Sequence, residues 1–329
     1  MTLTLRPIPP FRLDYTVWAL RRRGRNLIDR WDGATYRRVV VVEGRATELA
    51  IHQAGSNGDP RILVVATPPP RNGSETLHLR SVVERLLGLQ IDLTAWYRIA
   101  DADTRLGRLA HRFRGMKPPR FPTLFEALVN GFACQQLSLE VGLELLNRLA
   151  AISGLKFGKG SGVRYAFPLP VDLLRLPVEA YRAIGFSRQK TRAIRQLAVA
   201  TTRGLALDSL VDEENAVVRE RLLDLHGVGR WTAEYVLLRG LGRLQTFPGD
   251  DVGARNRLAK WLGGSIQLDY DGVANLVDGW QPFAGLVYFH LLLQGLSEKG
   301  MFEVGPGIQL EPSDDAVQNA RDRFSNGRG

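Results

Sequence analysis

Two adjacent carboxylates, Asp250 and Asp251, stand after a short Gly/Pro loop and at the start of a helical pattern. They follow a tight turn, His226-Gly227-Val228-Gly229, and a predicted helix that begins at about Arg230. Glycines on both sides of one apolar residue let the backbone turn sharply and come close to another surface. The amides that open the next helix then form a site for a phosphate. A carboxylate pair downstream of such a turn indicates chemistry beside the anion site.

The elements that must position these carboxylates are predicted to be helices. From about residue 92 onward apolar residues recur at helical spacing, and the segment MKPPRFPT marks the entry to a second domain. Ser138 and Ser187 are the expected N-caps of two of these helices. The helix after Ser187 carries a basic face formed by Arg188, Lys190, Arg192 and Arg195. Such a face suits either a phosphate backbone or ordinary solvent.

The first 90 residues are predicted to form a sheet with little helix. Segments rich in β-branched and aromatic residues indicate strands within 11–20, 35–44, 46–55 and 61–69. One helix, within 76–89, is expected to pack on that sheet. The run Arg21-Arg22-Arg23 suits either a DNA contact or a solvated guard on an edge strand.

Composition bounds the class of protein. The chain has 329 residues, enough for two domains. It holds 44 Lys and Arg against 34 Asp and Glu, a net charge of +10, which favours a polyanionic partner. The alternative is a basic but otherwise unremarkable protein, so charge alone does not decide the partner.

Cysteine usage excludes several kinds of site. Cys134 is the single cysteine in the sequence, so an intrachain disulfide and a four-cysteine zinc or iron–sulfur site are excluded. It lies in an apolar run and is expected to be a small core residue. The five histidines show no metal-binding spacing. The N-terminus does not read as a signal peptide, and no apolar run reaches the roughly 20 residues that span a bilayer. We therefore expect a cytoplasmic, nucleoid-associated protein without a membrane partner.

The residues around the carboxylates resemble the helix-hairpin-helix DNA glycosylase superfamily, and within it the DNA-3-methyladenine glycosylase II (AlkA-like) branch. The resemblance rests on the hairpin Leu225 to Gly229, on Arg230-Trp231-Thr232-Ala233, on Tyr235, and on the loop Phe247-Pro248-Gly249-Asp250-Asp251. Upstream, CQQLS and AIGFSRQKTRAIRQLA also resemble that branch, so the likeness spans roughly residues 116–300.

The resemblance implies that Asp251 is the catalytic carboxylate. A helix N-terminus stabilises an anion there. Cleaving an N-glycosidic bond builds positive charge on the sugar, and a carboxylate beneath it stabilises that charge and orients or deprotonates the attacking water. An alkylated purine is already a cationic leaving group. The alternative is that Asp250 and Asp251 are ordinary N-cap residues, and for Asp250, as a structural neighbour, we prefer that interpretation.

Trp231 bears on which kind of glycosylase the resemblance implies. In bifunctional relatives, which cut the strand through a Schiff base, a lysine stands at that position, and without its amine the lyase route has no nucleophile. We expect a monofunctional hydrolase that leaves an abasic site.

The same resemblance assigns the residues around the flipped base. Trp231 and Tyr235 lie four apart on one helix and are implied to line the base pocket, the alternative being packing in the core. The family's aromatic in the last helix falls on Leu292 here, which puts the breadth of substrates in doubt. Gln136 and Leu137 correspond to the residues that fill the gap left by the base, the alternative being a buried helix corner.

The hairpin residues Gly227, Val228, Gly229 and Arg230 are implied to hold the DNA backbone through the amides of Gly227, Gly229 and Trp231. In the family, hairpin carbonyls also hold a monovalent or similar cation. We expect no side-chain metal ligand and no other cofactor.

The sequence thus predicts an α+β protein: a β-rich N-terminal domain with packing helices (1–115), a helical helix-hairpin-helix glycosylase domain (116–300) and a polar tail (301–329). The predicted function is excision of alkylated bases, 3-methyladenine foremost, from double-stranded DNA by a monomer in base excision repair. The alternatives are a glycosylase for oxidised or deaminated bases and a non-catalytic DNA-binding module.

Overall fold

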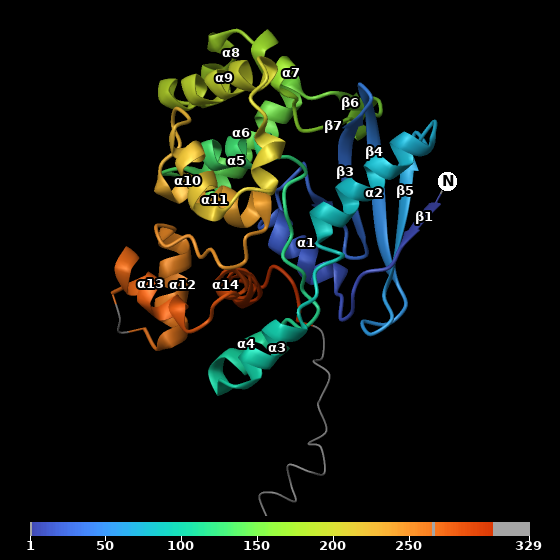
Figure 1. Cartoon of the computed structure of the whole chain (residues 1–329). Helices are drawn as coiled ribbons and strands as arrows, with labels where there is room; N and C mark the ends of the chain where they lie inside the picture. The colour runs from blue at the N-terminus through green and yellow to red at the C-terminus, as the bar shows by residue number, and fades with distance from the viewer. Residues whose placement is uncertain (1, 265–266, 305–329) are drawn as a thin grey trace, which may run out of the picture.

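The computed structural model describes residues 2–264 and 267–304, and an antiparallel sheet forms the N-terminal side of the molecule (Figure 1). Its order is β1-β5-β4-β3-β2. The strands are β1 (Thr2–Leu5), β2 (Arg30–Trp31), β3 (Thr35–Val42), β4 (Arg45–Ala54) and β5 (Arg61–Thr67). The predicted strands within 35–44, 46–55 and 61–69 are confirmed. Alternating burial along β5 shows one face of the sheet turned to the core and the other to solvent.

The segment 11–20 is a helix, and the prediction of a strand there is wrong. Helix α1 (Leu13–Arg21) is buried at eight of its residues, so it has no polar face from which to read a helical period. Its Tyr, Thr, Val and Trp residues favour strands in isolation, but packing overrides that propensity. The predicted helix within 76–89 is confirmed as α2 (Gly73–Leu87), which Asn72 caps and which ends at Gly88.

The run Arg21-Arg22-Arg23 lies at the end of α1, and for Arg21 and Arg22 both predictions, a DNA contact or an edge-strand guard, are wrong. Arg21 and Arg22 are buried, at 5% and 3% exposure, rather than lying at a DNA surface or guarding an edge strand. Arg22 adopts a left-handed backbone, with φ 61°, and caps the C-terminus of α1. Arg23 donates to Glu140 on a later helix.

Among the described residues that follow the sheet, the regular structure is helical apart from a two-stranded ribbon, β6 (Lys156–Phe157) and β7 (Arg164–Tyr165). The α-helices before the hairpin are α3 (Thr94–Asp101), α4 (Thr104–Arg112), α5 (Leu124–Cys134), α6 (Leu139–Ser153), α7 (Pro170–Arg175), α8 (Val178–Ala183) and α9 (Arg188–Thr202). Those from the hairpin onward are α10 (Asn215–Leu223), α11 (Arg230–Val236), α12 (Val252–Leu262), α13 (Tyr270–Asp278) and α14 (Ala284–Glu298), with a π-helical turn η3 (Leu237–Leu241) after α11. Short 3-10 turns are η1 (Gly160–Gly162) and η2 (Leu207–Val211).

Two expected caps of these helices are confirmed. The side chains of Ser138 and Ser187 accept hydrogen bonds from Val141 N and Lys190 N. In the described residues, no helix combines the length and the apolar character needed to cross a bilayer.

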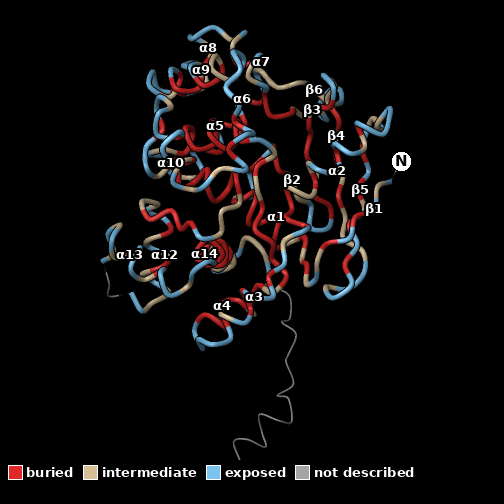
Figure 2. The backbone as a smooth tube through the Cα atoms, in the orientation of Figure 1, coloured by how far each residue is buried: buried red, intermediate tan, exposed pale blue. Residues whose placement is uncertain are grey.

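Three hydrophobic cores hold the molecule together, and the buried stretches of the tube converge on them (Figure 2). One lies between the sheet, α1 and α2, and a second lies within α5–α11 and η3. The third joins α1, α3 and α4 to α12, α13 and α14. This third core crosses the predicted boundary at 115/116, which stays a prediction. At the start of the predicted tail, Phe302 stacks on Trp18 at 5.5 Å, whereas residues 305–329 lie outside the described residues.

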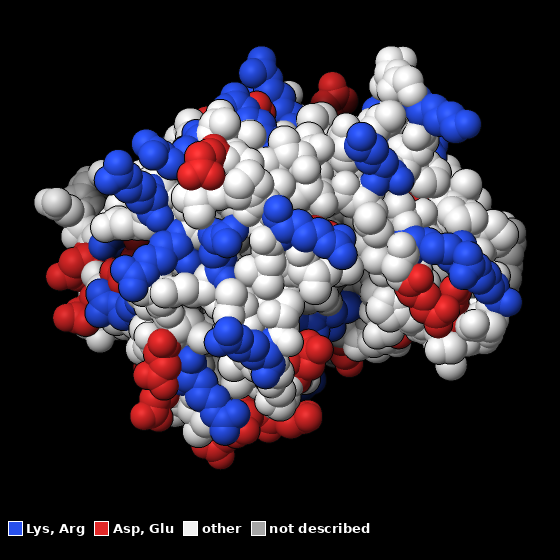
Figure 3. All heavy atoms as spheres, turned by 90° about the horizontal axis from the view of Figure 1, so that it is seen from above, with Lys and Arg blue, Asp and Glu red and all other residues white. Residues whose placement is uncertain are grey.

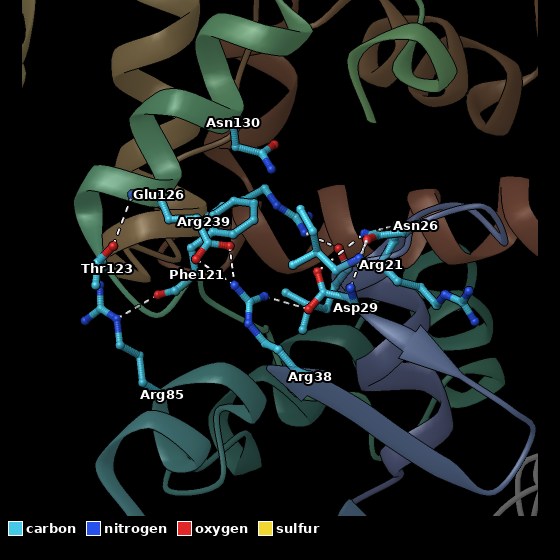
Figure 4. A network of polar contacts seen from close by, with 12 residues as sticks. Arg21, Asn26, Asp29, Arg38, Arg85, Phe121, Thr123, Glu126, Asn130 and Arg239 are labelled. Carbon is cyan, nitrogen blue, oxygen red and sulfur yellow. Dashed lines mark hydrogen bonds and ion pairs between the residues drawn. The ribbon is translucent and has the colours of Figure 1, made fainter. Parts of the chain in front are cut away.

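A buried ion network joins the sheet to α5 (Figure 4). Arg38 of β3 is 1% exposed and donates both to Asp29 and to Glu126 of α5. Glu126 lies eight residues before Cys134, at which α5 ends. The sheet therefore fixes the helix that leads to the predicted gap-filling residues.

Candidate DNA-binding and catalytic site

Asp251 caps the N-terminus of α12. Its Oδ1 accepts a hydrogen bond from Ala254 N at 2.8 Å, and its backbone N donates to Pro248 O at 3.0 Å. The other carboxylate oxygen, Oδ2, accepts from the Tyr288 hydroxyl at 3.4 Å. The carboxylate thus lies at the N-terminal end of α12, where the helix dipole presents its positive end.

Asp250 is not the N-cap that we expected. Its carboxylate instead accepts two hydrogen bonds from Arg230, at 2.6 Å from Nε and 3.0 Å from Nη2. Asp250 is thus used by an ion pair, whereas Asp251 caps α12 and has its second oxygen directed at Tyr288; the catalytic role of Asp251 stays a prediction.

Tyr288 of α14 is the residue that the sequence analysis missed. Burial, together with the nearby Asp251 carboxylate, raises the pKa of its hydroxyl well above the usual value, so Tyr288 is a neutral donor. Its ring packs edge-on against Phe247 of the loop, with ring centroids 5.8 Å apart. Leu292, at which we placed the family's aromatic, is a core residue at 3% exposure.

Trp231 and Tyr235 form the stacked pair that their spacing predicts, with ring centroids 5.2 Å apart and 25° between the planes. Trp231 is half-buried, whereas Tyr235 is 1% exposed. The alternative of core packing therefore describes Tyr235 in this structure, and Trp231 is the ring with an accessible edge.

Buried guanidinium groups surround Tyr235. Arg22 donates to the Tyr235 hydroxyl at 2.9 Å and to Asn130 Oδ1 at 2.9 Å, and Tyr235 itself donates to Asn130. Arg239 of η3 is fully buried, and its guanidinium carbon lies 5.9 Å from the Tyr235 ring centre. No local sequence pattern indicates this arrangement, because Arg22 and Tyr235 are 213 residues apart.

The predicted hairpin is confirmed as the turn between α10 and α11. Gly227 has φ +86°, and a Cβ there would lie 2.7 Å from Ala193 Cβ on α9, so both conformation and packing require glycine. A Cβ on Gly229 would meet nothing within 4 Å, which leaves that backbone open to an approaching surface. Val228 is buried at 8% exposure and anchors the turn.

The connection between α5 and α6 lies against this hairpin. The Gln135 amide donates to Gly227 O at 2.9 Å and to Thr232 Oγ1 at 2.6 Å. Gln136 and Leu137 are exposed, Leu137 at 42%, and Gln136 has the left-handed φ of 53°. The alternative of a buried helix corner is therefore wrong, and both side chains are accessible beside the hairpin.

The predicted basic face of α9 is only partly a surface. Lys190 donates to Ala133 O and Gln135 O, at 2.9 and 2.8 Å, and so supports the connection to α6 instead of facing solvent. The other arginines of α9 lie along a groove of about 570 Å³ that Val178, Val199 and Ala200 also line. Figure 3 shows Lys and Arg side chains spread over the face of the molecule seen from above.

Metal-binding side chains are not gathered in the described part of the chain: it holds no group of three or more His, Cys, Asp or Glu that would bind an ion. Cys134 is buried, as expected, and free. The monovalent or similar cation that the family resemblance implies would be held by backbone carbonyls of the hairpin, which are hard oxygen ligands. Of these, the Gly227 carbonyl already accepts the Gln135 amide.

Known proteins agree with this geometry. The family model "HhH-GPD superfamily base excision DNA repair protein" matches residues 129–282, which contain the hairpin, Trp231 and Asp251. The DNA-3-methyladenine glycosylase 1 of Schizosaccharomyces pombe is 31% identical over 46% of this chain and 64% of its own length. The chain thus spans slightly less than two thirds of that relative.

Two solved structures extend the likeness. The 3-methyladenine DNA glycosylase of Archaeoglobus fulgidus has a TM-score of 0.76 and 26% identity, over 88% of this chain and 97% of its own. The S. pombe 3-methyladenine DNA glycosylase in complex with abasic DNA has a TM-score of 0.52 and 25% identity, over 62% of this chain and 96% of its own. Residues 129–282 therefore match the HhH-GPD superfamily of base excision DNA repair proteins, and the chain is similar in sequence and fold to 3-methyladenine DNA glycosylases.

Proposed function

We propose that this protein is a monofunctional DNA N-glycosylase that flips alkylated bases, 3-methyladenine foremost, out of double-stranded DNA and hydrolyses their glycosidic bond. One arrangement carries the proposal: an open glycine hairpin, a stacked Trp231 and a helix-capping Asp251 follow one another along the chain, and Arg230 beside the hairpin binds Asp250 next to Asp251. The relatives named as 3-methyladenine glycosylases support the same reaction.

The mechanism follows from the geometry of Asp251. Oδ1 is held by Ala254 N, so the carboxylate has a fixed direction, and Oδ2 faces the neutral Tyr288 hydroxyl. As the glycosidic bond breaks, positive charge develops on the sugar, and a fixed anion stabilises it. The same oxygen orients or deprotonates the attacking water. Because Trp231 offers no amine, the reaction ends at the abasic site.

DNA contacts come from two neighbouring segments. Gly227, Gly229 and Arg230 would hold the phosphate backbone, and a cation, if bound, would use hairpin carbonyls other than that of Gly227. Gln136 and Leu137 would fill the gap left by the flipped base. We propose that the protein acts as a monomer in the compartment that holds the DNA.

The decisive experiment measures base release from methylated duplex DNA by wild type and by Asp251→Asn. Asparagine caps a helix about as well as aspartate, so α12 keeps its N-cap while the anion is lost. We expect release to fall at least a hundredfold while binding to an abasic duplex is retained. Asp103→Asn is the matched control, because Asp103 caps α4 in the same way. Release at the wild-type rate by Asp251→Asn would refute the mechanism, and an enzyme–DNA adduct trapped by borohydride would refute the monofunctional assignment.

A second candidate, excision of an uncharged oxidised or deaminated base, is favoured by the cations around Tyr235. Arg22 and Arg239 already occupy its surroundings and would repel a positively charged purine. Duplexes with 8-oxoguanine or hypoxanthine, assayed beside methylated DNA, separate the two. A non-catalytic module would release no base from any of them.

A further inference from the structure

We propose that Glu234 and Tyr270 are positioning residues that clamp the loop carrying Asp251 and tie it to the DNA-binding hairpin. This inference rests on the proposed function, in which Asp251 is the working anion.

The first half of the clamp is a buried carboxylate whose two oxygens are both bonded. Glu234 of α11 is 2% exposed. Its Oε2 accepts the backbone N–H of Gly249 at 3.1 Å, and its Oε1 accepts the Tyr270 hydroxyl at 2.7 Å. Gly249 lies two residues before Asp251, so Glu234 holds the loop by its backbone immediately before the carboxylate.

The second half is the Tyr270 ring, at the start of α13. A Cβ on Gly249 would lie 2.8 Å from ring atom Cδ2, so the loop can lie this close to the ring only with glycine at that position. On the ring, the Arg230 guanidinium carbon lies 3.7 Å from the centroid. Tyr270 therefore packs against the loop and against the first residue of α11.

The contacts close into a ring of interactions. Arg230 binds Asp250 through two hydrogen bonds, and Asp250 follows Gly249 in the loop. Glu234 accepts the Gly249 N–H and the Tyr270 hydroxyl. The Arg230 guanidinium lies on the Tyr270 ring, which completes the ring of interactions. The ring begins and ends in α11, directly after the hairpin. When the hairpin is bound to the DNA backbone, these contacts therefore set the position of the Asp251 carboxylate relative to the sugar of the flipped nucleotide.

Glu234 and Tyr270 contact the loop and Arg230, and neither is among the residues proposed to hold the DNA, so we expect the clamp to act on the chemical step and not on affinity. A displacement of about 1 Å of a catalytic group can cost on the order of a hundredfold in rate. Loosening the clamp would accordingly lower the rate of base release and leave the affinity for an abasic duplex nearly unchanged.

The test uses Glu234→Leu, Tyr270→Phe and the double variant in the whole chain. Leucine fills most of the space of the side chain but has no oxygen to accept the Gly249 N–H or the Tyr270 hydroxyl, so both hydrogen bonds are lost. We expect single-turnover release from methylated duplex DNA to fall about 10- to 100-fold in each single variant, with the dissociation constant for an abasic duplex changed less than about threefold. The double variant should be about as slow as the slower single variant, because both act through one contact.

Tyr181→Phe is the matched control, since it also removes a buried tyrosine hydrogen bond, that to Leu173 O at 2.6 Å, far from the loop in sequence. Its release rate should equal that of wild type. A wild-type rate in Glu234→Leu, or an equal loss of rate and affinity in the clamp variants, would overturn the inference.

Hydrogen exchange separates failure of the clamp from failure of the proposed function. In Glu234→Leu, peptides covering 247–251 should exchange at least tenfold faster than in wild type, whereas in Tyr181→Phe they should not. Unchanged exchange of this loop refutes the clamp. Faster exchange in a protein whose wild type releases no base supports the clamp and refutes only the glycosylase assignment.

Discussion

Arg38→Met removes the cation that two buried carboxylates share at the junction of the sheet and α5. The Arg38 guanidinium lies 2.6 Å from Asp29 Oδ1, and 2.5 and 2.6 Å from the two Glu126 oxygens. Asp29 keeps the Tyr36 hydroxyl at 2.7 Å, but Glu126 loses both hydrogen bonds to its carboxylate. Breaking a buried pair in this way costs about 3–5 kcal/mol of unfolding free energy.

The pH dependence of that loss follows from Glu126. Burial raises the pKa of its carboxyl above the usual value of 4.5, and Arg38 opposes that rise. Without Arg38 the native pKa rises further, so the folded variant takes up a proton where the unfolded chain does not. A raised native pKa favours folding below it, and the deficit of the variant is therefore largest at high pH and shrinks as the pH falls toward 5.

Urea unfolding at pH 8 and pH 5.5, compared with wild type at each pH, measures both quantities. The control is Arg37→Met on the same strand, because Arg37 makes a looser, exposed pair with Asp32 at 3.8 Å. It should change the unfolding free energy by less than about 1 kcal/mol. Equal effects of the two substitutions, or a deficit of Arg38→Met that grows as the pH falls, would refute the reasoning.

Three further outcomes are expected. Gly227→Ala should lower the free energy of unfolding by about 1–2 kcal/mol or more, because φ is +86° and the new Cβ would meet Ala193. Gly229→Ala should unfold like wild type but bind abasic duplex DNA more weakly in an anisotropy titration. Burial lowers the pKa of His290 to about 4 from 6.5, so the folded protein keeps the ring neutral and loses free energy of unfolding as the pH falls from 6.5 toward 4. Between pH 7.5 and pH 4.5, His290→Leu should therefore lose less free energy of unfolding than wild type, by up to about 3 kcal/mol. Leu137→Ala should weaken binding to the abasic duplex without changing the melting temperature, because Leu137 is 42% exposed, and unaltered affinity would exclude it as the gap filler.

The parts of the fold that were predictable from the sequence have local signals. The hairpin, the serine caps and the start of α12 are set by glycines and capping side chains within a few residues. Helix α1 was not predictable, because it is buried nearly all round and leaves no period to read.

The site shows the same division. Asp251 and Trp231 follow from the motif, but the partners that fix them come from distant segments. Tyr288 lies in a helix that is apolar almost throughout, so no polar face singles it out. The burial of Arg22 depends on Asn130 and Tyr235, 108 and 213 residues later in the chain.

The core that joins α1, α3 and α4 to α12, α13 and α14 has a consequence for how the chain folds. Trp18 and Tyr15 share this core with Leu286 and Phe289, so its contacts close a loop of nearly the whole chain. During synthesis the first helix emerges long before the last one, and until α14 follows, its apolar residues have no complete partner surface. Contacts of such long range form slowly. The N-terminal segment is therefore completed last although it is made first, and we expect chains truncated before α14 to expose α1 and to aggregate.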